Sequence, residues 1–355
     1  MTWRVGLVGI GGFAQEAYLP ALRATNGMEV TLLCGRSRER AEAVNRTWAL
    51  DARVEEGVDG LDRALEDDAV DAVIVVVPDR LHAEMVRVVL DAGRHVLCEK
   101  PITIDTASAR DLRDLATRTQ SVAMMAFTYR YTLALRQARQ LIEDGVIGDV
   151  ASVSYEVHYG GGLGDLTWRE DGEASPGGIW FDGGSHMIDT VGVLVGPMTA
   201  THVVAGTVTR SSGARPSNPD VAAVVGAVER GTPWFDMVHR GSSHESDRKI
   251  PVSGVLSRLE HMAPDQVRVI GSDGSLGFLL GHGDVEWLDV WRADGEHRRV
   301  LTVEEGGAGP QAPKAAARMV EAWRDSLDRG ELSEWDAGFD VGCAVQEVLS
   351  GVELQ

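Results

Sequence analysis

A short glycine-rich loop near the N-terminus constrains the fold of this chain more than any other feature. The apolar stretch Trp3 to Val8 predicts a strand, the loop Gly9-x-Gly11-x-x-Ala14 follows it, and a helix runs on to about Arg23. Glycines here allow a tight turn and a close approach to a pyrophosphate, and the helix start adds free amides. The loop predicts a dinucleotide site, with a purely structural turn as the alternative. The cofactor-binding candidates are Gly9, Gly11, Gly12, Phe13 and Ala14.

Strand and helix patterns then alternate. Val70 to Val77 is a continuous, mostly β-branched run, as in a strand buried on both faces. Six such units predict an α/β fold that begins with a Rossmann domain, a doubly wound parallel sheet. We place this dinucleotide-binding domain at 1–127, and a second α/β domain for substrate binding and oligomerisation at 128–355. Its mostly antiparallel open sheet is expected from strands at 151–159, 202–209, 221–229, 234–240, 266–270, 275–280, 285–291 and 299–303.

Composition and charge exclude several partners. The net charge is −20, from 34 basic and 54 acidic side chains, which argues against nucleic acid and against an anionic membrane. No charged and apolar leader opens the sequence, and no apolar run is long enough to span a membrane. Cys34, Cys98 and Cys343 are far apart and lack metal-ligand spacing. They predict reduced thiols and a cytoplasmic protein.

The end of the second strand bears on the choice of cofactor. NAD-binding domains usually place an acidic residue there, to hold the ribose diol. This chain has Gly35, Arg36 and Ser37 instead, and the first carboxylate is Glu39 in the next helix. A small residue followed by arginine and serine suits a 2′-phosphate, so NADP is favoured over NAD. The alternative is that Arg36 and Arg38 are simply solvated at a helix start.

A single lysine marks the end of another strand. The chain has only three lysines, and Lys100 follows the short strand His95 to Cys98 directly. A lysine can be tuned by burial as an arginine cannot, and Pro101 holds its neighbour extended. The backbone of Val77 to His82 is expected, by position, to flank the nicotinamide side of the cofactor. The further cofactor-binding candidates are Pro78, His82, Glu99 and Lys100. Simple packing near the cofactor is the alternative for His82, and Glu99 is given a structural role, not a catalytic one.

A helix over about 179–195 carries the acid–base candidates. Asp182, His186 and Asp189 stand at i, i+4 and i+7, so they share one helix face. A carboxylate beside an imidazole orients it and raises its pKa, which suits proton transfer. The alternatives are a helix-face metal site and a capping or packing cluster. We predict no metal.

Two aromatic–arginine pairs are candidates for substrate binding. Tyr129 and Arg130 lie at the domain junction, and Trp168 and Arg169 lie in a glycine-rich loop at 160–178. Aromatic faces and arginines are common in carbohydrate pockets. Junction packing is the alternative for each pair.

Five motifs lie along the chain in a definite order. They are Gly9-Ile10-Gly11-Gly12, Pro78-x-x-x-His82, Gly93-x-His95-Val96-x-x-Glu99-Lys100-Pro101, Tyr129-Arg130 and Gly177-Gly178-x-x-x-Asp182-x-Gly184-x-His186-x-x-Asp189. In this order they resemble the Gfo/Idh/MocA oxidoreductases, the relatives of glucose–fructose oxidoreductase and inositol dehydrogenase. The resemblance covers nearly the whole chain.

The resemblance implies a Rossmann domain and an α/β domain whose open sheet often forms an oligomer interface, so a homodimer or homotetramer is expected. It also implies pyridine-nucleotide-dependent chemistry on sugars, cyclitols and related diols. The family's catalytic trio falls on Lys100, Asp182 and His186, and the Lys100–Pro101 bond is expected to be cis. The sequence departs from the family at Asp79, often asparagine, and at Ile179, often glycine.

Together these features predict an NADP-preferring oxidoreductase. The expected reaction moves a hydride between nicotinamide and a secondary alcohol or ketone carbon of a sugar, nucleotide-sugar or cyclitol. In this hypothesis His186 transfers the proton, Lys100 hydrogen-bonds the reacting oxygen, and Asp182 fixes His186 or contacts the substrate. The alternatives are a cofactor-retaining NAD-dependent glycosidase and a non-catalytic nucleotide-binding sensor of the same fold.

Overall fold

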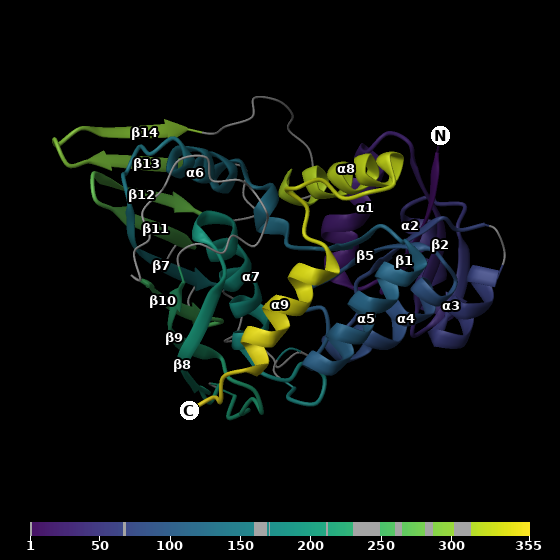
Figure 1. Cartoon of the computed structure of the whole chain (residues 1–355). Coiled ribbons are helices and arrows are strands. Elements are labelled where there is room, and N and C mark those ends of the chain that lie inside the picture. The colour runs from purple at the N-terminus through teal and green to yellow at the C-terminus, as the bar shows by residue number, and fades with distance from the viewer. Residues whose placement is uncertain are drawn as a thin grey trace. The chain divides into compact units, whose positions relative to one another are not determined.

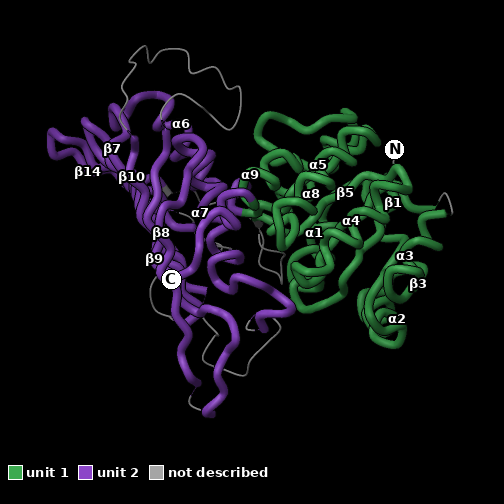
Figure 2. Tube along the Cα trace, turned by 60° about the horizontal axis from the view of Figure 1, so that its bottom comes forward, with its two compact units in different colours: residues 1–128, 308–346 green, residues 129–307, 347–355 purple. Residues whose placement is uncertain are grey.

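The structure is a computed structural model that describes residues 2–66, 69–159, 169, 171–210, 212–229, 249–259, 265–280, 287–301 and 314–355 (Figure 1). The chain forms two compact units. Unit 1 comprises Met1–Thr128 and Ala308–Gln346, and unit 2 comprises Tyr129–Gly307 and Glu347–Gln355 (Figure 2). The chain therefore returns to unit 1 near its end. The domains predicted from the sequence, 1–127 and 128–355, did not include this return.

Unit 1 is built on a six-stranded parallel sheet in the order β3-β2-β1-β4-β5-β6. Its elements are β1 Trp3–Val8, the π-helix η1 Ala14–Tyr18, α1 Leu19–Ala24, β2 Met28–Gly35, α2 Arg38–Thr47, β3 Arg53–Glu56, α3 Gly57–Glu66, β4 Ala72–Val75, the 3-10 turn η2 Asp79–Leu81, α4 His82–Asp91, β5 His95–Cys98, α5 Thr106–Thr119, β6 Ala123–Met125 and α8 Lys314–Arg329. All four residues of β4 are buried, as its apolar run predicts for a central parallel strand.

Local chemistry fixes the helix boundaries of this unit. The Ser37 hydroxyl accepts a hydrogen bond from the Arg40 amide and caps α2, and Asp105 caps α5 in the same way. Helix α8 reaches back to the start of the chain, where the Trp3 indole donates to Asp328 at 2.8 Å. This contact and the packing of α8 against α1 account for the return of the chain to unit 1.

Unit 2 contains an eight-stranded sheet in the order β14-β13-β12-β11-β7-β10-β9-β8. Its elements are β7 Val150–His158, α6 Leu133–Glu143, α7 Gly178–Val195, β8 Met198–Gly206, β9 Val221–Val228, β10 Ile250–Ser257, β11 Gln266–Gly271, β12 Gly274–Leu279, β13 Trp287–Arg292 and β14 His297–Leu301. The 3-10 turn η3 Thr128–Tyr131 and helix α9 Phe339–Ser350 each contain residues of both units. Within the described residues, β7 and β10 pair in parallel and the other neighbours pair antiparallel, which confirms the mostly antiparallel sheet.

Helices α6 and α7 cover one face of this sheet (Figure 1). Helix α7 is buried on nearly all sides, and only Asp182 and Val195 of its residues keep intermediate exposure. A helix that is apolar all round belongs in a core. The helix that carries the acid–base candidates is therefore also the central core helix of unit 2.

Two elements of unit 2 were not predicted. Helix α6 has the usual signals, a capping Thr132 whose hydroxyl accepts from the Leu135 amide and apolar residues at helical spacing. Strand β10 alternates buried and exposed residues, but Pro251 and Gly254 interrupt the strand pattern. Strand β8 begins at Met198 and not at His202. The strand expected at 234–240 lies outside the described residues.

Candidate active site

The glycine-rich turn joins β1 to η1 in a conformation that only glycine tolerates. Gly9 has a φ of +89°, and a Cβ there would lie 2.0 Å from the Val76 carbonyl oxygen. At Gly11 a Cβ would meet no atom within 4 Å, and Gly11 and Gly12 are both exposed. The turn thus leaves open space beside a helix start whose first amides have no intrahelical partners. These residues fit the phosphates of a dinucleotide.

The helix after this turn begins as the π-helix η1 rather than as the predicted α-helix. Such turns are rare and occur often at functional sites. Phe13 packs edge-on against Tyr18, with ring centroids 5.8 Å apart. The Tyr18 hydroxyl donates to Glu99 Oε1 at 2.6 Å, in a fully buried setting. The turn and the end of β5 are therefore joined beneath the surface by a residue that gave no signal in the sequence.

The three residues that follow β2 differ in whether their side chains have hydrogen-bond or ion-pair partners. Arg36 is exposed and makes no hydrogen bond or ion pair within the described part of the chain. Ser37 caps α2. The Arg38 guanidinium lies 3.4 Å from Glu55, a half-exposed arginine held by a buried carboxylate. Hydrogen bonding from Arg53 lowers the pKa of Glu55, so this carboxylate stays ionised.

His82 does not have the surroundings of a cofactor ligand. Its side chain is 0% exposed, and both ring nitrogens lie at hydrogen-bond distance from backbone carbonyl oxygens. Nδ1 is 2.6 Å from Pro101 O, and Nε2 is 2.9 Å from Val77 O. Neither ring nitrogen is left to donate to or accept from a cofactor, contrary to the prediction that His82 binds the cofactor directly. The His82 side chain instead forms a buried link between the ends of β4 and β5.

Glu99 and Lys100 form the end of β5. The Glu99 carboxylate accepts from the Tyr18 hydroxyl and, at 3.1 Å, from the Lys100 backbone amide. Burial raises the pKa of Glu99, and the nearby Lys100 charge opposes that rise. Lys100 itself is half-buried, and the Lys100–Pro101 peptide is cis, as the resemblance implied. Glu99 thus anchors the backbone at the residue that carries the ammonium group.

In unit 2 the three polar residues of the α7 face have different partners. The rings of His186 and Tyr129 lie 4.4 Å apart, tilted by 31°. Asp182 accepts from Arg258 at 2.6 Å, and the Arg169 guanidinium lies 3.8 Å from the same oxygen. An aromatic ring thus flanks the imidazole and arginines hold the Asp182 carboxylate, and the pairing of Asp182 with His186 stays a prediction.

Arg130 was expected to face the substrate, but it is buried against the same helix. Its guanidinium donates to both carboxylate oxygens of Asp189, with Nε–O distances of 2.9 and 3.0 Å. Both side chains are 1% exposed. Arg130 therefore ties the η3 turn to α7, which is the junction-packing alternative. Trp168 lies outside the described residues.

Arg258 and a set of buried hydroxyls were not anticipated. Arg258 directly follows β10, so missing that strand hid its position. The Tyr155 and Tyr159 hydroxyl groups are buried, and the pKa of each is raised by burial and by the neighbouring Tyr129. Asp265, whose pKa burial also raises, accepts from the His158 amide at 2.6 Å. These groups give the α7 side of unit 2 more hydrogen-bonding capacity than the sequence indicated.

The described residues lack two features of other classes of protein. They contain no group of three or more His, Cys, Asp or Glu side chains arranged to hold a metal ion. Their helices include none with the length and apolar character needed to cross a membrane.

Comparison with known proteins agrees with this geometry. A family model described as the oxidoreductase family with an NAD-binding Rossmann fold matches residues 3–127, and the model of its C-terminal alpha/beta domain matches residues 139–342. A dTDP-3,4-didehydro-2,6-dideoxy-alpha-D-glucose 3-reductase of Streptomyces violaceoruber is 31% identical over 362 residues, which cover 99% of this chain and 93% of that protein.

Two solved structures share the fold. A 3-ketoreductase from Actinomadura kijaniata in complex with TDP-benzene and NADP has a TM-score of 0.75 and 22% identity, over 99% of this chain and 97% of that one. A levoglucosan dehydrogenase in complex with NADH and levoglucosan has a TM-score of 0.82 and 21% identity, over 99% and 96%.

The parallel sheet and its glycine-rich turn define a nicotinamide-dinucleotide-dependent oxidoreductase. The chain belongs to the Gfo/Idh/MocA oxidoreductase family, which confirms the resemblance carried by the five motifs.

Proposed function

We propose that this protein transfers a hydride between NADP and a secondary alcohol or ketone carbon of a sugar, nucleotide-sugar or cyclitol. The observation that carries the proposal is Lys100 at the carboxyl end of β5, where α/β sheets bind their ligands, with its backbone amide fixed by Glu99. The 31% identical relative is named as a reductase of a nucleotide-linked keto-sugar, which supports this substrate class.

Each proposed role is argued from the contacts that the residue makes within its own unit. With its phosphates bound at the glycine-rich turn, the dinucleotide would supply or accept the hydride through its nicotinamide. Lys100 donates a hydrogen bond to the reacting oxygen and stabilises negative charge as it develops there. His186, stacked on Tyr129, transfers the proton. Asp182 is proposed to act with Arg258 and Arg169, as a fixed carboxylate that contacts substrate hydroxyl groups.

A substrate screen tests this function. The purified protein is mixed with NADPH and a panel of dTDP-linked keto-sugars, free keto-sugars and inosose-type cyclitols, and NADPH absorbance is followed. We expect oxidation of NADPH with at least one ketone. Release of an aglycone from a glycoside with no net change in cofactor would contradict the proposal and favour the glycosidase.

The preference for NADP is proposed to rest on Arg36. Its guanidinium is free among the described residues, whereas Arg38 is held by Glu55. A hydrogen bond between charged groups contributes about 1.5–3 kcal/mol, so Arg36→Ala is expected to raise the NADPH Kd roughly 10- to 100-fold. The NADH Kd should change little. Fluorescence titration of both nucleotides measures the two values.

Arg38→Ala is the matched control, since it removes the same charge two residues away and is expected to leave the ratio of the two Kd values near that of the wild type. Equal loss of NADPH and NADH binding in Arg36→Ala would show that Arg36 does not read the 2′-phosphate.

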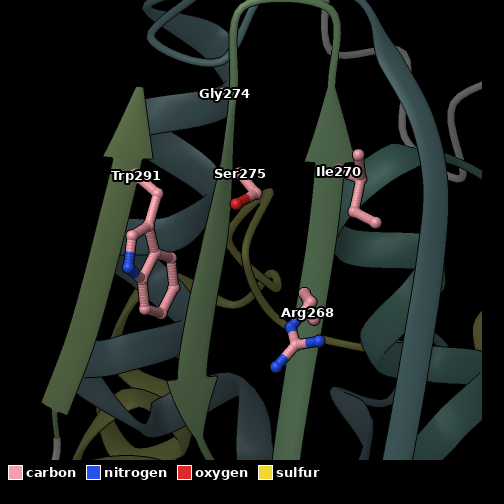
Figure 3. A pocket seen from close by; sticks show the side chains of 5 residues that line it. All are labelled: Arg268, Ile270, Gly274, Ser275 and Trp291. Atoms are coloured by element: carbon pink, nitrogen blue, oxygen red, sulfur yellow. The ribbon is translucent and has the colours of Figure 1, made fainter. Parts of the chain in front are cut away.

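The face of the unit 2 sheet opposite helices α6 and α7 is proposed to pair with a second copy of the chain. Strand register places Val204, Val225, Val255, Ile270 and Trp291 on one face, and all five are exposed. A depression of about 340 Å³ lies there among Arg268, Ile270, Ser275 and Trp291 (Figure 3). Exposed apolar patches of this kind mark interaction surfaces.

Trp291→Arg places a charge on this face and is expected to shift a homodimer or homotetramer towards smaller species. Light scattering after gel filtration measures the change. Glu42→Arg adds an arginine on exposed α2 of unit 1 and should leave the mass unaltered. An unchanged mass in Trp291→Arg would place the interface elsewhere.

A cytoplasmic location also remains a proposal, supported by three buried, free cysteines.

A further inference from the structure

The His82 imidazole lies between two backbone carbonyl groups from different segments of unit 1. One carbonyl belongs to Val77, beyond the end of β4, and the other belongs to Pro101, the residue after Lys100. The side chain is 0% exposed, so water cannot take the place of either contact. The imidazole therefore bridges the two strand ends at which the nicotinamide and the reacting oxygen are proposed to bind.

Two short contacts to carbonyl oxygens set the proton count of the ring. A carbonyl oxygen only accepts, and a neutral imidazole has a single N–H donor. A neutral ring would leave one nitrogen lone pair facing an oxygen lone pair at 2.6 or 2.9 Å. The imidazolium form donates from both nitrogens and satisfies both carbonyls.

A buried carboxyl group, that of Glu99, lies within electrostatic range of the imidazole. Burial raises the pKa of Glu99, and the charges of Lys100 and His82 oppose that rise, so the carboxylate and the imidazole interact. The titratable groups on the surrounding elements are Cys98, Glu99 and Lys100 at the end of β5, Asp79 in η2 and Tyr18 in η1. Glu99 also accepts from Tyr18 and from the Lys100 amide.

We propose that His82 is a positioning residue, held as a doubly donating imidazolium, that ties the end of β4 to the turn carrying Lys100 and so fixes the direction of the Lys100 side chain. Its kinetic consequence rests on the proposed function, but its protonation state does not. Small displacements of a catalytic group cost up to roughly 100-fold in rate. Loss of His82 should therefore act on turnover and not on nucleotide binding.

The first test reads the ring directly. Nitrogen NMR of the wild-type chain labelled at histidine, with the His82 signals assigned by their loss in His82→Asn, reports the protons on each ring nitrogen. We expect both ring nitrogens to carry a proton, since each faces a carbonyl oxygen. A neutral ring with one bare nitrogen would overturn the proposal.

The second test is kinetic. His82→Phe keeps the volume but donates no hydrogen bond, and we expect kcat to fall by roughly 10- to 100-fold while the substrate KM and the NADPH Kd change little. Glu84→Gln, on the exposed side of α4, is the matched control and should keep wild-type kcat. An unchanged kcat, or a loss confined to KM, in folded His82→Phe would overturn the positioning role.

The two tests separate this inference from the proposed function. A wild-type chain that reduces no ketone in the screen counts against the proposed function, and the NMR result then decides the state of His82 alone. His82→Asn, smaller and polar, provides the kinetic comparison if His82→Phe does not fold.

Discussion

Replacing Lys100 with alanine is expected to lower kcat by roughly 100- to 1,000-fold, the usual effect of removing one donor to a developing oxyanion. Lys100 is half-buried after the end of β5, and its backbone amide is fixed by Glu99. The backbone that carries the donor is thus held in place before substrate arrives, and such preorganisation makes the loss of a donor costly. NADPH binding should change little, because the phosphates are proposed to bind at Gly11 and Gly12.

Steady-state kinetics with the ketone found in the screen, together with NADPH titration, measure this effect. Lys249→Ala is a matched control: Lys249 is one of only three lysines and lies on the surface, 2.9 Å from the exposed Glu229. Lys100→Arg keeps the charge but not the compact ammonium, so it should recover little activity. Near-normal turnover of Lys100→Ala would remove Lys100 from the mechanism.

Breaking the buried pair between Arg130 and Asp189 is expected to have the largest effect on stability. Asp189→Ala leaves a guanidinium that is 1% exposed without its carboxylate, and removing one partner of such a pair costs about 3–5 kcal/mol. The pair joins η3 to α7, the core helix of unit 2. We therefore expect a large fall in the urea midpoint and in Tm, with soluble yield falling as well.

The double variant Arg130→Met with Asp189→Leu removes both charges and fills the space, so it should recover much of the stability lost in Asp189→Ala. Glu229→Gln, in the exposed pair with Lys249, should cause no resolvable change. Urea unfolding followed by circular dichroism compares the four proteins. A small effect of Asp189→Ala on stability would contradict the structural role given to the pair.

The sequence determined the elements of unit 1 closely, because their signals are local. A parallel strand buried on both faces must be apolar throughout, as β4 is. A turn that needs a φ of +89° against a neighbouring backbone must use glycine, as at Gly9. The predicted strand at His95–Cys98 matches β5, and the predicted helix at 339–350 matches α9. Unit 2 was less predictable, since β10 contains a proline and a glycine.

The sequence also identified the candidate residues of the site, but not the side chains that they contact. Lys100, Asp182, His186 and Asp189 are named by motif and spacing alone. Spacing places Asp182 and Asp189 on one helix face with His186, yet only tertiary packing brings Arg258 to the first and Arg130 to the second. Likewise, the sequence predicts that His82 lies near the cofactor, but it does not indicate the two carbonyl groups that His82 contacts. These carbonyl groups belong to one segment before His82 in the chain and one segment after it.

The physical reason for this division is the range of the interactions. Backbone conformation, capping and strand burial depend on a few neighbouring residues, so a sequence records them. A buried charge or imidazole must find its partner among groups many residues away, since leaving it unpaired costs more than most single contacts contribute. Which partner it finds is settled only when the strands and helices pack.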